Sequence, residues 1–208
     1  MKKLIVAALT LSLLWGCRPG GPEYVEDIDV VYTTFDDTFD FAGRGTYAMP
    51  DQIVTDIEIE NGDTTFVFMN AALAAPILNE IDAQMSAYGW SKIDPSSSQP
   101  DIVVMPAAIK STTVYYSYWY DWWYGGWGGW YGGYWGWYYP PYYTVSSYTT
   151  GSLIITIADP DANDNPIRES QTAWIMVGNG LFVGAYDVSR VTKAIDQGFA
   201  QSPYLKTN

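Results

Sequence analysis

The sequence contains no histidine and a single cysteine, Cys17, among its 208 residues. The lack of histidine excludes Ser-His-Asp and Cys-His catalysis, and it removes one of the two residue types that dominate zinc sites. Carboxylates remain, and glycosidases work with two of them, but the spacing of the acids singles out no such pair. We therefore expect a non-enzymatic protein with no catalytic residue, no metal and no cofactor; a carboxylate-based hydrolase is the least favoured alternative.

Basic residues are also scarce. The chain has 10 Lys and Arg against 23 Asp and Glu, a formal net charge of −13. Nucleic-acid binding needs Lys and Arg to displace the counterions around phosphates, and an acidic surface repels the same phosphates. We therefore expect no nucleic-acid partner, although the chain is rich in aromatic residues that could stack on bases.

The single cysteine follows a short apolar run that is typical of an export signal. Lys2 and Lys3 precede residues 4–15, which are apolar apart from two hydroxyl residues. This run is too short for a spanning helix, which needs ~20 apolar residues, and the positive start and the small Gly16 fit a cleavable signal. The four residues that end at Cys17, Leu-Trp-Gly-Cys, resemble a lipobox. We expect residues 1–16 to be a lipoprotein signal peptide.

Lipid on Cys17 would hold the mature chain at a membrane. A lone cysteine in an exported chain cannot form an internal disulfide, which supports this role. Residues 17–27 begin with several Pro and Gly and are expected to form a flexible, lipidated tether. No acidic residue follows Cys17 directly, so by the general logic of Gram-negative lipoprotein sorting we expect the periplasmic side of the outer membrane, with display on the cell surface as the second choice.

The remaining chain, residues 28–204, predicts a single α+β domain. Two helices are expected, one over residues 76–88 with Pro76 in its first turn and Gly89 past its end, the other over residues 188–199. Each carries an apolar face at helical spacing: Ile77, Ile81, Met85 and Tyr88 in the first, and Val188, Val191, Ile195 and Phe199 in the second.

Strand signals predict a mostly antiparallel sheet of about five strands, with both helices packed on one face. The signals are runs of β-branched and aromatic residues, and Asn61-Gly62 marks a hairpin turn. They fall at residues 28–35, 46–49, 53–59, 65–69, 101–109, 151–157 and 172–177. Two acidic clusters, at residues 36–40 and 159–165, fit ordinary turns, since Asp and Asn bond to their own backbone there.

Residues 115–143 form an aromatic and glycine-rich segment. Its 29 residues include 7 Trp, 11 Tyr and 7 Gly, and one charged residue, Asp121. Glycine costs about 1 kcal/mol in a helix relative to alanine, so a spanning helix is not expected. We expect a long hairpin insertion that serves as the contact surface of the protein, through Trp119, Trp122, Trp123, Trp127, Trp130, Tyr134, Trp135 and Trp137.

Several kinds of binding partner would suit this aromatic segment. Trp and Tyr dominate the binding energy of many protein interfaces, and their rings also stack on sugars, so an envelope protein and a glycan such as peptidoglycan are both candidates. The rings also favour the membrane–water interface. A further alternative needs no partner: the segment is a low-complexity insertion, disordered in part or packed on its own sheet.

Several short motifs, in order along the chain, resemble a known family of bacterial lipoproteins. They are Asp40-Phe41 with Gly43 and Thr46-Tyr47-Ala48, the helix that ends at Gly89, Gln99-Pro100-Asp101 before an apolar strand, Gly151-Ser152-Leu153 through Asp159, Trp174 through Gly178, and the last helix with Pro203. The family is the domain of unknown function 4136. This resemblance implies an envelope lipoprotein with a small α+β domain, and it implies no activity and no catalytic residue.

Overall fold

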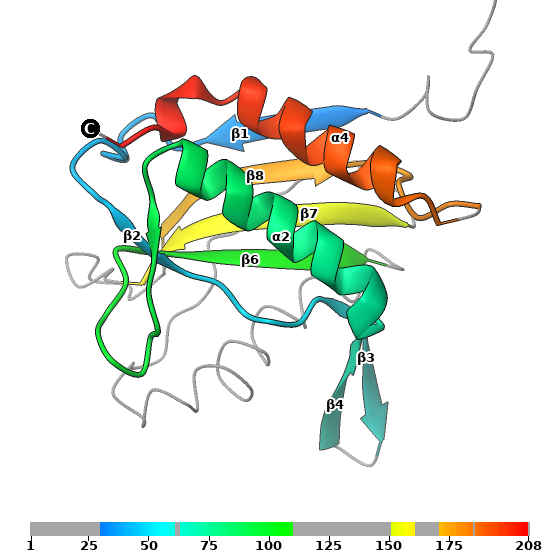
Figure 1. The fold of residues 1–208 in the computed structure, drawn as a ribbon. Helices are drawn as coiled ribbons and strands as arrows, with labels where there is room; N and C mark the ends of the chain where they lie inside the picture. Colours follow the sequence, from blue (N-terminus) through cyan, green and yellow to red (C-terminus); the bar gives the residue numbers. More distant parts are fainter. Residues whose placement is uncertain (1–29, 61–62, 110–150, 161–170, 185, 208) are drawn as a thin grey trace, which may run out of the picture.

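The computed structural model describes residues 30–60, 63–109, 151–160, 171–184 and 186–207. In this part of the chain a mixed β-sheet carries two α-helices on one of its faces (Figure 1). The strands lie in the order β1-β8-β7-β6-β2-β5, and β3 pairs with both β4 and β6. The elements are β1 (Val31–Phe35), β2 (Thr46–Ala48), β3 (Val54–Glu60), β4 (Asp63–Phe68), α2 (Ala71–Ala87), β5 (Ser91–Lys92), β6 (Ile102–Ile109), β7 (Ser152–Asp159), β8 (Gln171–Gly178), α4 (Val188–Ala200) and the 3₁₀ helix η6 (Pro203–Leu205).

The sheet corrects two expectations from the sequence. It has eight strands among the described residues, where about five were expected, and it is mixed. Strands β1, β8, β7 and β6 form an antiparallel block and β3–β4 an antiparallel hairpin, but β2 runs parallel to β5 and β6, and β3 parallel to β6. Parallel neighbours need a long crossover, here the segment that contains α2, and hydrophobic alternation within one strand does not reveal such long-range pairing.

Helix α2 begins five residues earlier than expected. The Asn70 side chain caps it by accepting a hydrogen bond of 2.9 Å from the Ala72 N–H, and the Ala-rich residues 71–75 are strong helix formers. Pro76 therefore lies inside the helix and not in its first turn. The expected end is confirmed: Gly89 has φ +94°, a conformation that glycine adopts without strain.

Both helices bury their predicted apolar faces against the sheet. In α2, Ile77, Ile81 and Met85 are fully buried. In α4, Val191, Ile195 and Phe199 are fully buried, whereas Val188 stays 37% exposed because it stands in the first turn, beside the N-cap Asp187. The two helices contact each other across the same face (Figure 1), so this side of the sheet is the hydrophobic core.

The opposite side of the sheet is buried as well. Side chains alternate between the two faces along each strand, and the members that do not join the helix-side core lie across β6, β7 and β8. We call this set the second face: Val103, Met105, Ala107, Ile154, Thr156, Ala158, Ile175 and Val177, each at most 4% exposed. Among the described elements, none packs on it.

Candidate functional site

Strand β1 presents apolar side chains at an open edge of the sheet. Within the described residues it has a single neighbour, β8. Val30 is 56% exposed, Tyr32 43% and Phe35 42%. Edge strands are commonly protected from pairing with other chains by a charged residue or a proline, and the β1 sequence Val-Tyr-Thr-Thr-Phe has neither. We call Val30, Tyr32, Phe35 and the outward backbone of β1 the β1 edge.

The hydrogen bonds to β8 show which backbone groups of β1 point outward. Asn179 N–H donates to the Val30 carbonyl, and Asp36 N–H donates to the Ala173 carbonyl. Antiparallel pairs alternate between bonded and non-bonded positions, and Val31 stands opposite Gly178. The N–H and C=O of residues 30, 32, 34 and 36 therefore face β8, whereas those of residues 31, 33 and 35 face away from the sheet.

The ring of Tyr204 holds Phe35 in place. The two rings stack at a centroid distance of 3.8 Å. The Tyr204 hydroxyl lies 3.1 Å from Ser202 Oγ, which accepts a 2.9 Å hydrogen bond from the buried Trp174 Nε1. Because the Tyr204 ring is anchored through Ser202 to the core, the exposed edge of Phe35 is presented in one orientation.

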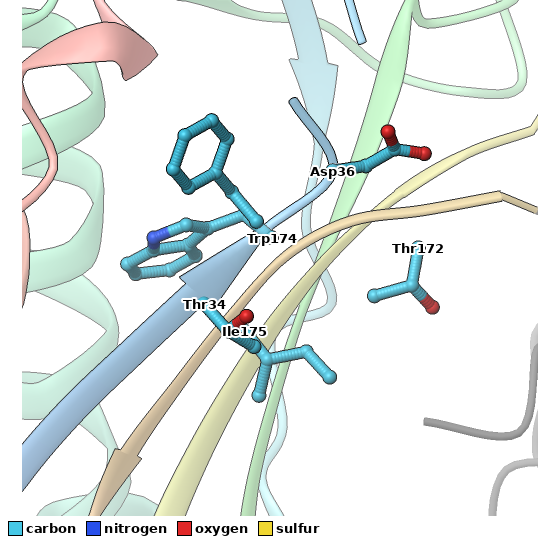
Figure 2. Close-up of a pocket in the computed structure, with 6 residues that line it drawn as sticks. Thr34, Asp36, Thr172, Trp174 and Ile175 are labelled. Carbon is cyan, nitrogen blue, oxygen red and sulfur yellow. The ribbon is translucent and has the colours of Figure 1, made fainter. Parts of the chain in front are cut away.

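A shallow depression lies where β1 and β8 leave the sheet. Thr34, Phe35, Asp36, Thr172, Trp174 and Ile175 line it, and its empty space, open solvent included, is ≈ 150 Å³. Figure 2 shows Trp174 directed to the side of the helices and Asp36 and Thr172 on the opposite side. Small-molecule sites usually hold about 300–1,000 Å³, so this depression is too small for a typical ligand.

Arg44 connects the loop after β1 to two strands. Its guanidinium forms a 2.7 Å ion pair with Asp159 at the end of β7, and it donates to the Asp101 carbonyl at 3.1 Å. It also lies over the Phe39 ring, 4.6 Å from the centroid. The Asp159 side chain is 7% exposed, and a buried carboxylate is stable only with such a partner. This cluster holds the fold together.

Asp101 ties the start of β2 to the start of β6. Its Oδ2 accepts hydrogen bonds from Gly45 N, Thr46 N and Thr46 Oγ1 at 2.7–2.9 Å. Burial acts to raise the pKa of this carboxyl, but these hydrogen bonds and the charge of Arg44 together lower it below its usual range. A carboxylate that is kept ionised and is saturated with donors is a structural anchor and is poorly suited to proton transfer.

A second polar link joins the sheet to α2. The fully buried Tyr47 donates its hydroxyl proton to Asp82 at 2.7 Å, and Asp82 also pairs with Lys92 at 2.9 Å. Burial and then the neighbouring Asp82 carboxylate raise the pKa of Tyr47 far above its usual range, so the hydroxyl stays protonated and acts as a donor.

One pair of acids lies at the junction of the two helices. The Gln84 amide donates to Glu80 at 3.0 Å and to Asp196 at 2.8 Å. The hydrogen bond from Gln84 lowers the pKa of Glu80, but burial and Asp196 raise it overall. Asp196 is exposed, and the depression described above is lined by other residues, whereas glycosidase carboxylates flank a bound sugar.

The sequence-predicted contact residues, Cys17 and those between Trp119 and Trp137, lie outside the described residues. In the acidic cluster at residues 36–40, Asp36 accepts from Thr38 N and Oγ1, and Asp40 from Gly43 N. These are the turn contacts that the sequence predicted. The described residues hold no group of acids that could bind a metal ion, and no described helix is long and apolar enough to cross a membrane.

The sequence predicted β1 as a strand but missed its position at the edge. A run of β-branched and aromatic residues looks the same in a central strand and in an edge strand. The one available signal was the alternation of Tyr32 and Thr34 with Val31 and Thr33, which is too weakly polar to show which face is exposed.

Comparison with known proteins gives one clear relationship. The family model of a domain of unknown function, DUF4136, matches residues 31–204. A DUF4136 family protein from Bacteroides thetaiotaomicron has a similar structure, with a TM-score of 0.64 and 28% identity over 86% of this chain and 97% of that one. No curated protein matches the sequence.

Two other solved structures are more distant. A PelC dodecamer from Paraburkholderia phytofirmans gives a TM-score of 0.37 and 12% identity, over 86% of this chain and 98% of that one. A PDZ domain protein from Parabacteroides distasonis gives 0.43 and 16%, over 86% of this chain and 37% of that one. The family match covers residues 31–204, which is more than half of the chain, and the chain therefore belongs to the DUF4136 family, a domain of unknown function.

Proposed function

We propose that this chain is a lipid-anchored protein of the cell envelope that works by binding another envelope protein and not by catalysis. The observation that carries the proposal is the β1 edge, where three apolar side chains stand 42–56% exposed beside backbone groups that pair with no other described strand. An extended segment of a partner can add a strand to such an edge: main-chain hydrogen bonds supply affinity and the side chains supply selectivity.

The described polar groups support binding over catalysis. Asp101, Asp159 and Asp82 are each engaged by donors that join parts of the fold. Of the two acids that share Gln84, Asp196 is exposed and Glu80 is partly exposed on the surface of α2. Each of these polar groups has a structural role, because its contacts stabilise the domain. An exposed apolar edge strand does not stabilise the domain, so its presence needs another explanation.

The anchor would place the β1 edge close to the membrane. Cys17 is the expected lipid site, and the chain reaches β1 at Val31. An extended chain spans at most about 3.5 Å per residue, so this tether holds the edge within roughly 50 Å of the bilayer. The partner is therefore expected at the same membrane, for which the periplasmic side of the outer membrane is our first choice and the cell surface the second.

The anchor is tested with Cys17→Ser in the full chain, expressed in a Gram-negative host. Wild type should incorporate labelled palmitate and sediment with the outer membrane, because two or more acyl chains give stable attachment. The variant should incorporate none and be lost from the outer-membrane fraction. Wild type without label, or a Cys17→Ser variant that sediments unchanged with the outer membrane, would contradict the anchor.

The edge is tested with Thr33→Pro, which removes an N–H that points away from β8. Because that N–H takes no part in the β1–β8 ladder, the domain should stay folded, while proline blocks a strand that pairs from outside. A photocrosslinker at Tyr32 should give one discrete adduct in wild type and at least tenfold less of it in Thr33→Pro. A crosslinker at the exposed Lys193 on α4 serves as the position control.

The adduct also identifies the kind of partner. A second envelope protein supports the proposal, whereas a mass of twice the chain would assign the edge to self-association. The same adduct from both positions, or none from Tyr32, would reject the edge as a binding surface. The glycan-binding alternative depends on Trp residues outside the described chain and stays a prediction; retention of the full chain on peptidoglycan would favour it.

A further inference from the structure

One end of the domain exposes a cluster of apolar side chains. Among the described residues, seven large hydrophobic side chains are exposed, and four of the seven lie at this end: Val30 (56%), Val183 (52%), Leu73 (39%) and Val188 (37%). Together with the partly exposed Phe182 and Tyr186 they form what we call the apolar end. A group of this kind on one side of a soluble domain is typical of a contact surface.

The pairing of the strands brings these residues to the same end of the sheet. Val31 at the start of β1 stands opposite Gly178 at the end of β8, which stands opposite Leu153 at the start of β7. The loop from β8 to α4 follows, and its Asn179 N–H donates to the Val30 carbonyl. Figure 1 shows the start of β1, this loop and the starts of α4 and α2 on its right-hand side.

Hydrogen bonds hold the loop between β8 and α4 in a defined shape. The Val183 N–H donates to the Gly180 carbonyl at 3.0 Å. The buried Arg190 guanidinium donates to the carbonyls of Gly180 and Val183 at 3.2 and 3.5 Å. Because the loop is fastened from beneath, the exposed Val183 side chain is presented outward without a further loss of backbone freedom on binding.

Two aromatic rings connect this loop to the first turns of α2. The Phe182 ring stacks on the Tyr186 ring at a centroid distance of 6.1 Å, and the Tyr186 hydroxyl donates to the Leu73 carbonyl at 2.9 Å. Residues 179–186 have the sequence Asn-Gly-Leu-Phe-Val-Gly-Ala-Tyr and contain no charged residue. Rings of this kind, apolar with a polar tip in the case of Tyr, favour the membrane–water interface.

We infer that the apolar end is the face that the domain turns toward the lipid bilayer, with Val183 inserted at the interface. This inference rests on the lipid anchor of the proposed function and adds an orientation to it. Cys17 and Val30 are 13 positions apart, so the anchor holds the end of the domain that contains Val30 nearest to the lipid. The opposite end is about 26 Å away along a strand of eight residues.

The charge of the protein favours apolar contact with lipid over electrostatic contact. A formal net charge of −13 repels anionic headgroups, so adhesion to a bilayer has to come from the burial of apolar side chains. One small loop binds a bilayer weakly when the protein is free in solution. An anchored loop has an effective concentration on the order of millimolar, so weak insertion is sufficient to orient the domain.

This orientation leaves most of the β1 edge accessible to a protein partner. Val30 belongs to both surfaces and would lie at the lipid. Phe35 stands five residues further along β1, about 16 Å from Val30 at the usual rise of a strand. Tyr32 and Phe35 therefore remain outside the bilayer, where an extended segment of an envelope protein can reach them.

The test uses the lipidated full chain in vesicles of phosphatidylethanolamine and phosphatidylcholine that contain a phosphatidylcholine with a spin-labelled acyl chain. Cys17 is the only cysteine and carries lipid in the anchored protein, so Val183→Cys gives a single site for a fluorophore. Ser98→Cys is the matched control, since Ser98 is exposed in the loop before β6, at the opposite end of the sheet. The spin label should quench the fluorophore at position 183 at least threefold more than the one at position 98.

A second pair of variants tests whether the loop itself causes the contact. With the fluorophore at Leu73→Cys, Val183→Asp should reduce the quenching at least threefold, because a carboxylate is costly to bury in lipid. Ser98→Asp adds the same charge at the opposite end and should leave the quenching unchanged. Circular dichroism of each variant checks that the domain is folded.

Flotation of the vesicles in a density gradient separates the failure of the orientation from the failure of the anchor. Protein that floats and shows both expected differences supports the inference. Protein that floats with equal quenching at positions 183 and 98, or with no effect of Val183→Asp, overturns the orientation and leaves the anchor standing. A fluorophore at position 183 that is shielded from water but not quenched by the spin label also overturns it, because a protein or a second copy then covers the apolar end. Protein that does not float overturns the anchor and this inference with it.

Discussion

Buried polar side chains in this domain are almost all paired, and the exception is informative. Trp174 Nε1 donates to Ser202, Trp90 Nε1 donates to the Leu205 carbonyl, and the Tyr47 hydroxyl donates to Asp82. Among the described residues, Thr156 Oγ1 is buried and has no hydrogen-bond partner. Leaving a buried hydroxyl unpaired costs free energy, so Thr156 lowers the free energy of unfolding of the domain.

Thr156→Val should stabilise the domain by about 1 kcal/mol, because a methyl replaces an unpaired hydroxyl of nearly the same shape. Urea unfolding of the full chain, followed by circular dichroism, measures the change. Thr46→Val is the matched control: its hydroxyl donates to Asp101 Oδ2 and accepts from Asp101 N, so this variant should be destabilised. A loss of stability in Thr156→Val would show that the hydroxyl has a partner or a ligand.

Asp101 acts at the scale of elements, since one carboxylate joins the starts of β2 and β6. Asp101→Asn should destabilise the domain by about 1–3 kcal/mol at neutral pH, the range for hydrogen bonds to a charged group. The folded state lowers the pKa of Asp101, so its contribution is present above the pKa of the unfolded chain and is lost as the pH falls through the folded value. The difference between wild type and variant should therefore shrink in acid.

Unfolding free energies measured at several pH values between 7 and 3 check this dependence. Asp51→Asn, which removes an exposed carboxylate, controls for the change in net charge. A difference between wild type and Asp101→Asn that stays constant down to pH 3 would contradict the assigned role.

Local patterns were sufficient for most elements and insufficient for their assembly. The faces of α2 and α4, the end of α2 at Gly89 and the β3–β4 hairpin follow from spacing and turn chemistry within a few residues. The start of α2 was misplaced because Pro76 is tolerated inside the helix, after a cap and an alanine run. The parallel pairing of β2 with β6 joins positions 55 residues apart, Tyr47 with Ile102, and no local periodicity records it.

In the candidate site, too, the sequence predicted the local structure but not how the parts come together. The strand propensity of Val31–Phe35 was visible, but its place at the edge follows from the order of all the strands. The family motifs were visible as well, and their roles became clear only in three dimensions. Asp101 meets Thr46, Asp159 meets Arg44, and Trp174 meets Ser202, so these motifs specify how the domain is assembled.

At the scale of the whole molecule, the C-terminal residues close the core. The Leu205 side chain is fully buried, and its carbonyl accepts a 2.8 Å hydrogen bond from Trp90 Nε1. Thr207 N–H donates to the Tyr88 carbonyl at the end of α2, and the Tyr204 ring supports Phe35 at the β1 edge. Residues 204–207 thus connect the end of α2 with Phe35 at the β1 edge, although these two parts are far apart in the sequence.

Truncation after Ser202 should therefore destabilise the whole domain by about 3–5 kcal/mol. The loss combines the burial of Leu205, roughly 2–3 kcal/mol, with hydrogen bonds worth about 1 kcal/mol each. Stabilities of small domains are only about 5–15 kcal/mol, so the thermal unfolding midpoint should fall by roughly 10 °C or more. Removal of Asn208 alone is the control and should change nothing. If the longer truncation unfolds at the wild-type temperature, the contacts of Leu205 and Thr207 contribute nothing to the stability of the domain, which would contradict this prediction.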